Sequence, residues 1–390
     1  MGDGVPGVPV KTGLEVLVEE GLPLLEGKRV GLVTNHTGVD ARLRSGIELL
    51  RASRRWRLVA LFGPEHGIRG EAQAGVHVGS TVDRRTGLPV HSLYGETRRP
   101  PLALLRGLDA LVFDLQDVGV RYATYASTLA LVQEAAAEVG VPVVVLDRPN
   151  PLNGVQVEGN LPSTEFASFV GIHPVPARHG LTIGELAWLS AAERGLPAPA
   201  VVPMRGWQRG QWFDETGLPW VQPSPNLPTL EALTLYTGTC LIEGTNVSEG
   251  RGTTRPFELL GAPWIDPFAL VGDLEARGLP GVAFRPAYFT PVFSKHAGAL
   301  CAGVQIHVTD RESLRPVELG LHLLHALRRL SGGEFAWLRG DGGHLVDRLL
   351  GSDRPRRALD AGASVARVIA DWEEQAREFE RRRRPYLLYE

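Results

Sequence analysis

Short apolar runs alternate along this chain with loops rich in Asp, Glu, Asn, His and Arg. The runs have the length and composition of buried strands, and they are Arg29–Val33, Arg57–Phe62, Ala110–Phe113, Val141–Leu146 and Thr239–Ile242. Helix-like stretches lie between them at Thr128–Val139 and Leu181–Arg194, the second with Thr182 as a plausible N-cap. This alternation predicts an α/β protein with a mostly parallel sheet and helices on both of its faces.

The chain is longer than a single hydrophobic core usually supports, so we expect two domains. The pattern changes after residue 262, where the segments Pro267–Arg277, Val282–Pro286, Val304–Val308, Val317–Leu330 and Ser364–Arg382 read as helix, strand, strand, helix and helix. We therefore predict a larger domain over residues 12–262 and a smaller α+β auxiliary domain over residues 263–390. The loop-rich segment Pro197–Pro228 is an alternative place for the hinge.

Composition narrows the class of protein. With 43% hydrophobic and 22% charged residues and a net charge of −3, the chain resembles a soluble globular protein with no general attraction to nucleic acid or membrane. The basic run Arg381–Arg384 stands beside glutamates and is typical of a salt-bridged helix face. Cys240 and Cys301 lie in apolar runs, which predicts two buried free thiols.

The beginning of the chain bears on its compartment. Residues Met1–Lys11 contain glycines and prolines but not the apolar core of a signal peptide. No stretch is long enough to cross a bilayer, so we expect no membrane insertion. The sequence as written predicts a cytoplasmic protein, or an exported one if its start is truncated. The oligomeric state is open.

Several kinds of site are excluded by their missing motifs. The chain has no G-x-x-x-x-G-K-[ST] phosphate loop, and no strand–G-x-G-x-x-G–helix unit for a dinucleotide. It also lacks H-E-x-x-H and C-x-x-C pairs and the G-x-S-x-G nucleophile elbow. We therefore expect neither a metal nor a cofactor.

The loop that follows Arg57–Phe62 carries the strongest chemical signal. Glu65, His66 and Arg69 stand there among glycines, directly after a predicted strand. In open α/β sheets, ligands bind at the carboxyl ends of the strands, where all these loops converge. Paired carboxylates serve as acid and base or nucleophile at acetal carbons, which favours glycoside chemistry over phosphoryl transfer. The candidate catalytic carboxylates are Glu65, Glu96, Glu243 and Glu249, with Glu65 preferred.

Some of the other polar residues also have structural explanations. Asp114 or Asp117 could cap the next helix, Asp147 could pair locally with Arg148, and His179 could be a structural histidine. Lys295 and His296 could close the cleft from the second domain.

Ordered motifs from about residue 13 to the C-terminus carry a resemblance to a known family. They are Thr34-Asn-His-Thr-Gly38, Gly63-Pro-Glu-His-Gly67, Tyr94-Gly-Glu96, Asp114-Leu-Gln-Asp-Val-Gly119, Leu146-Asp-Arg-Pro-Asn-Pro151, Arg178-His-Gly180, Ser224-Pro-Asn226 and Glu243-Gly-Thr-Asn246. In these motifs the chain resembles the bacterial exo-β-N-acetylmuramidases of the NamZ family. The resemblance implies a Rossmann-like domain plus an auxiliary domain, with the site in the cleft between them. It also implies a hydrolase that removes single N-acetylmuramic acid residues from the non-reducing ends of peptidoglycan fragments.

The converging loops and the shared motifs together give a set of candidate substrate-binding residues. They are Asn35, His36, His66, Arg69, Asp114, Gln116, Asp117, Arg121, Tyr122, Asp147, Arg148, Asn150, His179, Asn226, Asn246 and Arg251. Muramic acid carries a lactyl carboxylate, and an arginine suits it because its guanidinium offers two parallel donors. Of Arg69, Arg121, Arg178 and Arg251 we favour Arg121, which is next to Tyr122, and then Arg251.

Two other functions fit the same residues. The first is a binding protein for amino sugars or muropeptides that uses the cleft without turnover. The second is a deacetylase or esterase, which the missing metal triad and nucleophile elbow disfavour. The catalytic pair and the choice among retaining, inverting and substrate-assisted mechanisms stay open at this point.

Overall fold

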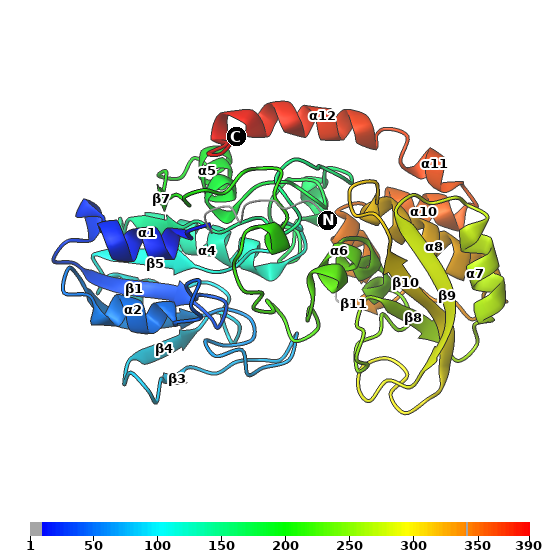
Figure 1. Ribbon diagram of the computed structural model, residues 1–390, viewed down its shortest axis with the longest axis horizontal. Helices are drawn as coiled ribbons and strands as arrows, with labels where there is room; N and C mark the ends of the chain where they lie inside the picture. The colour runs from blue at the N-terminus through cyan, green and yellow to red at the C-terminus, as the bar shows by residue number, and fades with distance from the viewer. Residues whose placement is uncertain (1–9, 341) are drawn as a thin grey trace, which may run out of the picture.

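The larger domain is built on a seven-stranded sheet. The computed structural model describes residues 10–340 and 342–390 (Figure 1). The strand order is β3-β4-β2-β1-β5-β6-β7, and all neighbours are parallel except β3 and β4. The bounds are β1 Arg29–Thr34, β2 Arg57–Gly63, β3 Thr81–Val82, β4 Pro89–Ser92, β5 Ala110–Asp114, β6 Val143–Leu146 and β7 Ala200–Val202. Four of the five strands expected from the apolar runs are confirmed.

Helices cover both faces of this sheet, as predicted, because alternate residues of each strand point to opposite sides. Leu111 and Phe113 of β5 pack with α4 and α5, whereas Ala110 and Val112 pack with α1 and α2. The bounds of the larger domain's helices are α1 Gly13–Glu20, α2 Gly46–Ala52, α3 Leu102–Leu105, α4 Thr124–Glu138 and α5 Ile183–Glu193. The expected N-cap of α5 is confirmed: the side chain of Thr182 accepts from Glu185 N. The result is the mostly parallel, Rossmann-like layer arrangement.

The fifth apolar run, Thr239–Ile242, was wrongly predicted as a strand. Thr239 ends helix α6, Leu230–Thr239, and the next residues form the 3₁₀ turn Cys240–Gly244. A four-residue apolar run looks the same in a buried helix as in a buried strand. Here α6 packs closely on a helix of the smaller domain, since a Cβ on Gly238 would lie 1.6 Å from Pro316 O.

The smaller domain has a three-stranded antiparallel sheet in the order β8-β10-β9, covered by helices (Figure 1). Its strands are β8 Leu259–Ala262, β9 Val282–Phe289 and β10 Cys301–Val308, with the short pair β11 Arg339–Gly340 and β12 Gly343–His344. Its helices are α7 Pro267–Glu275, α8 Pro316–Leu330, α9 Leu345–Leu350 and α10 Arg354–Asp360. Because β8 pairs with β10 and α6 packs on α8, elements before residue 263 contribute to this core.

The C-terminal segment returns to the larger domain. The single helix expected at Ser364–Arg382 is two helices, α11 Val365–Val368 and α12 Trp372–Arg383, and Phe379 of α12 is buried in the larger domain's core. Tyr389 then donates a hydrogen bond to Asp147 Oδ2 at 2.6 Å. Cys240 and Cys301 are buried and free, as expected. Within the described ranges, no helix combines the length and the apolar character needed to cross a membrane.

Candidate active site

A pocket of about 630 Å³ lies between the two domains. The larger domain contributes the loop after β2, the start of α4 and Tyr94, while the segment 223–227 forms part of the wall. The smaller domain contributes α6, the turn that follows it, the loop before β8 and the β9–β10 loop. Of the predicted site residues, the pocket is lined by Glu65, His66, Tyr122, Asn226, Glu243, Glu249 and Arg251.

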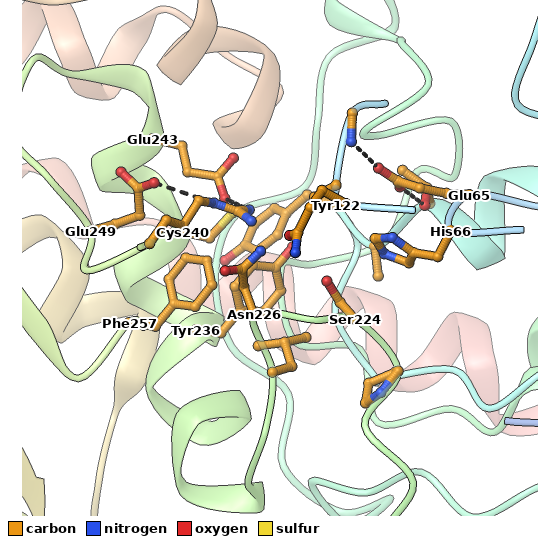
Figure 2. Close-up of a pocket in the computed structure, with 18 of the residues that line it drawn as sticks. Glu65, His66, Tyr122, Ser224, Asn226, Tyr236, Cys240, Glu243, Glu249 and Phe257 are labelled. Carbon is orange, nitrogen blue, oxygen red and sulfur yellow. Dashed lines mark hydrogen bonds and ion pairs between the residues drawn. The ribbon is translucent and has the colours of Figure 1, made fainter. Parts of the chain in front are cut away.

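Glu65 is held at the carboxyl end of β2 by two hydrogen bonds. Its Oε1 accepts from Gly75 N at 2.8 Å, and its Oε2 accepts from Thr124 Oγ1 at 2.6 Å. Only 8% of Glu65 is exposed. The loop after β2 therefore curls back on the carboxylate, and the first turn of α4 fixes its other oxygen, on the opposite side of the pocket from Glu243 (Figure 2).

His66 has a strained backbone with φ = 74°, followed by Gly67 at φ = 76°. A non-glycine residue in this region is uncommon and is often found at functional sites. Its Nδ1 is 2.8 Å from Ala72 O, and since a carbonyl oxygen can only accept, Nδ1 carries a hydrogen and Nε2 is left facing away from this bond. This sharp turn places Glu65 and His66 side by side on the same wall (Figure 2).

Two tyrosines of the larger domain face the Glu65 carboxylate. Burial, reinforced by the charge of Glu65, raises the pKa of Tyr94 to about 12. The same two causes raise the pKa of Tyr125, whose hydroxyl donates to Pro223 O at 2.6 Å and accepts from Asn35 Nδ2 at 2.7 Å. Both phenols are therefore neutral hydrogen-bonding groups near the carboxylate at physiological pH.

Four charged groups form a compact cluster on the opposite wall. Arg251 Nη2 donates to Glu243 Oε1 at 2.6 Å, and its Nε is 3.2 Å from Glu249 Oε1. Lys295 Nζ is 2.8 Å from Glu249 Oε2. Burial alone would lower the pKa of Arg251, but the charges of Glu243 and Glu249 outweigh it and raise this pKa. The cluster is neutral overall, and both of its carboxylates are bound to cations.

Aromatic rings and one amide complete the lining of the pocket. Tyr122 packs edge-on against Tyr236 with ring centroids 5.8 Å apart, and Tyr236 packs edge-on against Phe257 at 4.8 Å. The side chain of Asn226 makes no hydrogen bond to any residue that the structure describes, and it points into the space near these rings (Figure 2). Apolar ring faces beside a free amide suit a sugar, which has apolar faces and polar edges.

Several predicted site residues converge on the sheet edge but bond to one another below the pocket. Arg148 donates to both oxygens of Asp114, at 2.6 and 3.0 Å. Gln116 Nε2 donates to Asp117 O and Pro149 O, each at 2.8 Å. These residues do not line the pocket. They form a buried polar layer that satisfies the loop backbones and supports its floor.

The same layer holds buried groups with shifted pKa values. Burial raises the pKa of Asp117 to about 6 and that of Asp147 to about 7. Burial lowers the pKa of His179 to about 3, so this histidine is neutral, and its Nδ1 accepts from Leu181 N at 3.1 Å. Asn150 bridges backbone atoms, donating to Leu181 O at 2.9 Å. His179 thus takes the structural role that the sequence analysis weighed as its alternative.

Three of the four candidate arginines are engaged outside the pocket. The Arg121 guanidinium donates to the carbonyls of Asn160, Val175, Leu349 and Leu350 at 2.7–3.0 Å and is 2% exposed. Arg178 is buried, donates to Leu152 O and lies over the Trp212 ring. Arg69 pairs with Asp83 at 3.0 Å. The preference for Arg121 as a pocket residue was wrong, and of the four only Arg251 lines the pocket.

The remaining candidates also lie outside the pocket lining. Glu96 is exposed on its loop, and His36 Nε2 is 2.8 Å from Gln222 O. Asn246 bridges the backbone of Glu334 and Ala336, and His296 Nε2 is 2.7 Å from Asn246 O. Lys295 does reach the pocket from the second domain, as the sequence analysis suggested.

Sequence reasoning missed Thr124, Tyr236, Phe257 and Phe293, all of which line the pocket. Tyr236 was missed because it lies on α6, next to the run misread as a strand. Thr124 gave a usable signal, since it stands at the start of α4 directly after a polar loop, where a hydroxyl points toward the strand ends.

A Rossmann-like domain, an auxiliary domain and a carboxylate-bearing pocket between them define a two-domain α/β protein with its site in the interdomain cleft. Sequence profiles of the N-terminal and C-terminal domains of the exo-beta-N-acetylmuramidase NamZ match residues 30–231 and 234–389. The chain belongs to the NamZ family.

Individual relatives agree with this membership. The chain is 48% identical over 381 residues to the peptidoglycan beta-N-acetylmuramidase NamZ of Bacillus subtilis strain 168, covering 97% of this chain and 91% of that protein. A crystal structure of a DUF1343 family protein from Bacteroides fragilis matches with a TM-score of 0.89 and 37% identity, over 99% of this chain and 100% of that one. A second DUF1343 protein of the same organism matches with a TM-score of 0.79 and 32% identity, over 98% and 99% of the two chains.

Proposed function

We propose that this chain is an exo-acting β-N-acetylmuramidase that hydrolyses the terminal, non-reducing N-acetylmuramic acid of peptidoglycan fragments, with Glu65 as its acid/base. The observation that carries the assignment of Glu65 is that the other carboxylates of the pocket are paired with cations. Three carboxylates line the pocket within the described residues, and Glu65 is the only one of them without a cation partner. A carboxyl that must exchange a proton during turnover is better left free of a salt bridge, because a bound cation holds it ionised.

The surroundings of Glu65 fit this role. Hydrolysis of a glycoside needs a proton at the leaving oxygen and a base for the incoming water. Gly75 N and Thr124 Oγ1 fix the direction of the carboxyl group, and the second ring nitrogen of His66 beside it can hydrogen-bond to a hydroxyl or a water molecule. The cavity volume lies within the roughly 300–1,000 Å³ usual for small-molecule sites.

The other two pocket carboxylates have a different role in this proposal. Glu243 and Glu249 hold Arg251, and Glu249 also holds Lys295, so they arrange the cations of the smaller domain. The larger domain thus supplies the proton transfer, and the smaller domain supplies charged and aromatic contacts to the sugar. The sugar ring packs against the partly exposed Tyr236, which Tyr122 and Phe257 support from the core, with Asn226 as a hydrogen-bonding partner.

The experiment is Glu65→Gln, which keeps the size and most hydrogen bonding of the side chain but removes its titrating group. Turnover of a chromogenic β-N-acetylmuramide should fall by a factor of about 10² or more, with an unchanged circular dichroism spectrum. Glu96→Gln is the matched control, since Glu96 is exposed and outside the pocket, and it should retain full activity. An unchanged rate for Glu65→Gln at saturating substrate would remove Glu65 from the mechanism. A wild-type protein that binds the muramide without releasing phenol would instead support the binding protein.

A further inference from the structure

Recognition of muramic acid requires a cation, because its lactyl carboxylate is ionised at neutral pH. Within the described residues, Arg251 and Lys295 are the lysines and arginines that line the pocket. Both come from the smaller domain. The question is which of them has hydrogen-bonding capacity left for a ligand.

Most of the hydrogen-bonding capacity of Lys295 is already used. Its ammonium group has three hydrogens. Nζ donates to Ile242 O at 2.9 Å and Val247 O at 2.8 Å, and it lies 2.8 Å from Glu249 Oε2. Two of its three donors therefore hold the turn after α6, and Glu249 balances its charge, so Lys295 has at most a single donor to offer to a substrate and not a fork.

Arg251 differs because only part of its guanidinium is used. Of its five N–H groups, one at Nη2 reaches Glu243 and the one at Nε faces Glu249. Its guanidinium carbon also lies 5.1 Å from the centre of the Phe257 ring. The side chain is 18% exposed, and the pocket is the space it faces. A preoriented guanidinium with donors to spare is the usual receptor for a carboxylate.

The two glutamates bound to Arg251 are not equivalent. Glu249 is 2% exposed and is also bound to Lys295, so it is fixed. Glu243 is 31% exposed and has Arg251 as its only ion-pair partner within the described residues. A second carboxylate from a ligand would compete with Glu243 for the outer edge of the guanidinium, and Glu243 is free to turn toward solvent.

We propose that Arg251 determines specificity for muramic acid by binding the lactyl carboxylate, and that Glu243 occupies this position until the substrate's carboxylate replaces it. The inference rests on the proposed function and deepens it, since it names the residue that distinguishes a muramide from a glucosaminide. No bond is made or broken in this exchange. One carboxylate replaces another on the same cation.

The test compares the dissociation constants of N-acetylmuramic acid and its lactyl amide, measured by isothermal titration calorimetry, so that the ligand alone changes in the wild-type protein. The acid should bind about 10- to 100-fold better than the amide, the usual contribution of a charged hydrogen bond. In Arg251→Met this ratio should fall to about one. In Glu243→Gln it should rise several-fold, because the competing carboxylate is gone.

Arg255→Met is the matched control. Arg255 lies on the same loop and pairs with Glu258 at 3.0 Å, but it does not line the pocket, so its ratio should equal that of the wild type. If Arg251→Met is unstable, Arg251→Lys keeps the charge but loses the fork, and an intermediate ratio is then expected. Thermal melting of each variant shows which of the two to use.

Two results would overturn the inference: an acid-to-amide ratio that Arg251→Met leaves at the wild-type value, or one that Glu243→Gln lowers. Neither depends on turnover. A wild-type protein that prefers the acid but fails to release phenol from a chromogenic muramide would contradict the proposed function and leave the assignment of Arg251 in place.

Discussion

Arg121 connects the two domains, and its replacement by methionine should destabilise the protein without changing its choice of sugar. The guanidinium donates to two carbonyls of the larger domain, Asn160 O and Val175 O, at 2.7 and 2.8 Å. It also donates to Leu350 O and its neighbour Leu349 O, at 2.9 and 3.0 Å. These last two carbonyls belong to the final turn of helix α9, where the backbone carbonyls have no N–H partners within the helix. Arg121 therefore satisfies a helix C-terminus across the domain boundary.

The magnitude follows from the acceptors left behind. Each buried carbonyl without a donor costs about 1–3 kcal/mol, so four would cost roughly 4–12 kcal/mol if nothing relaxed. Removing a buried charge returns part of this, since burial already disfavours the ion and lowers the pKa of Arg121 to about 10. Asn160 Nδ2 also still donates to Leu350 O at 2.8 Å. We therefore expect a loss of about 3–5 kcal/mol, the usual cost of removing one partner of a buried ionic interaction.

Such a loss is a large share of the stability of a typical domain, about 5–15 kcal/mol. Urea unfolding followed by tryptophan fluorescence measures it. Arg69→Met is the control, because Arg69 pairs with Asp83 and is 38% exposed, and it should cost about 1 kcal/mol or less. The folded fraction of Arg121→Met should keep the wild-type preference for the muramide over the glucosaminide. Wild-type stability combined with a lost preference would show that Arg121 contacts the substrate and would refute this reasoning.

Two further predictions concern the hydrogen bond of Thr124 to Glu65 and the buried carboxyl group of Asp147. Thr124→Val removes the donor to Glu65 Oε2, so kcat should fall about tenfold or more and the pH profile of kcat/KM should shift. Thr124→Ser keeps the hydroxyl and should restore both. An unshifted pH profile in Thr124→Val would show that Thr124 is merely structural. Burial raises the pKa of Asp147 to about 7, so its folded form keeps a proton that the unfolded chain loses above about pH 4, and this stability is lost as the pH rises through 7. Asp147→Asn cannot ionise and should gain on the wild type by up to roughly 4 kcal/mol between pH 4 and 8, measured as a difference in unfolding free energy. A difference in unfolding free energy that stays constant from pH 4 to 8 would contradict this. The buried His173 and His179 do not disturb the comparison, because they are present in both proteins.

Local patterns along the chain were enough for the framework of the larger domain. Runs such as Ala110–Phe113 are apolar on both sides because helices cover both faces of the sheet, and polar loops must follow where such strands end. Glu65 could therefore be placed from sequence, since it follows β2 directly and the ends of parallel strands meet at one edge.

The arginines show where this reasoning stopped. Arg121 and Arg251 both stand in polar loops that converge on the same region, and nothing in their neighbours along the chain separates them. Arg121 is used up by carbonyls more than 200 residues away, at separations of 228 and 229, and these partners are invisible to a local pattern. Arg251 stays at the pocket because its partners Glu243 and Glu249 lie on the same loop region and leave its outer edge accessible.

The sequence by itself determined the four central strands β1, β2, β5 and β6, the edge at which the site lies and the residue types available there, because burial periodicity and turn chemistry act over a few residues. Only the tertiary structure decided that Thr239–Ile242 is helical, that the smaller domain completes the pocket, and which polar groups remain free within it. A buried polar group must be paired, and in this protein most partners come from distant parts of the chain. The polar groups that remain free are those without a partner once this pairing is complete. A short stretch of sequence cannot show which groups these are, because it does not contain the distant partners.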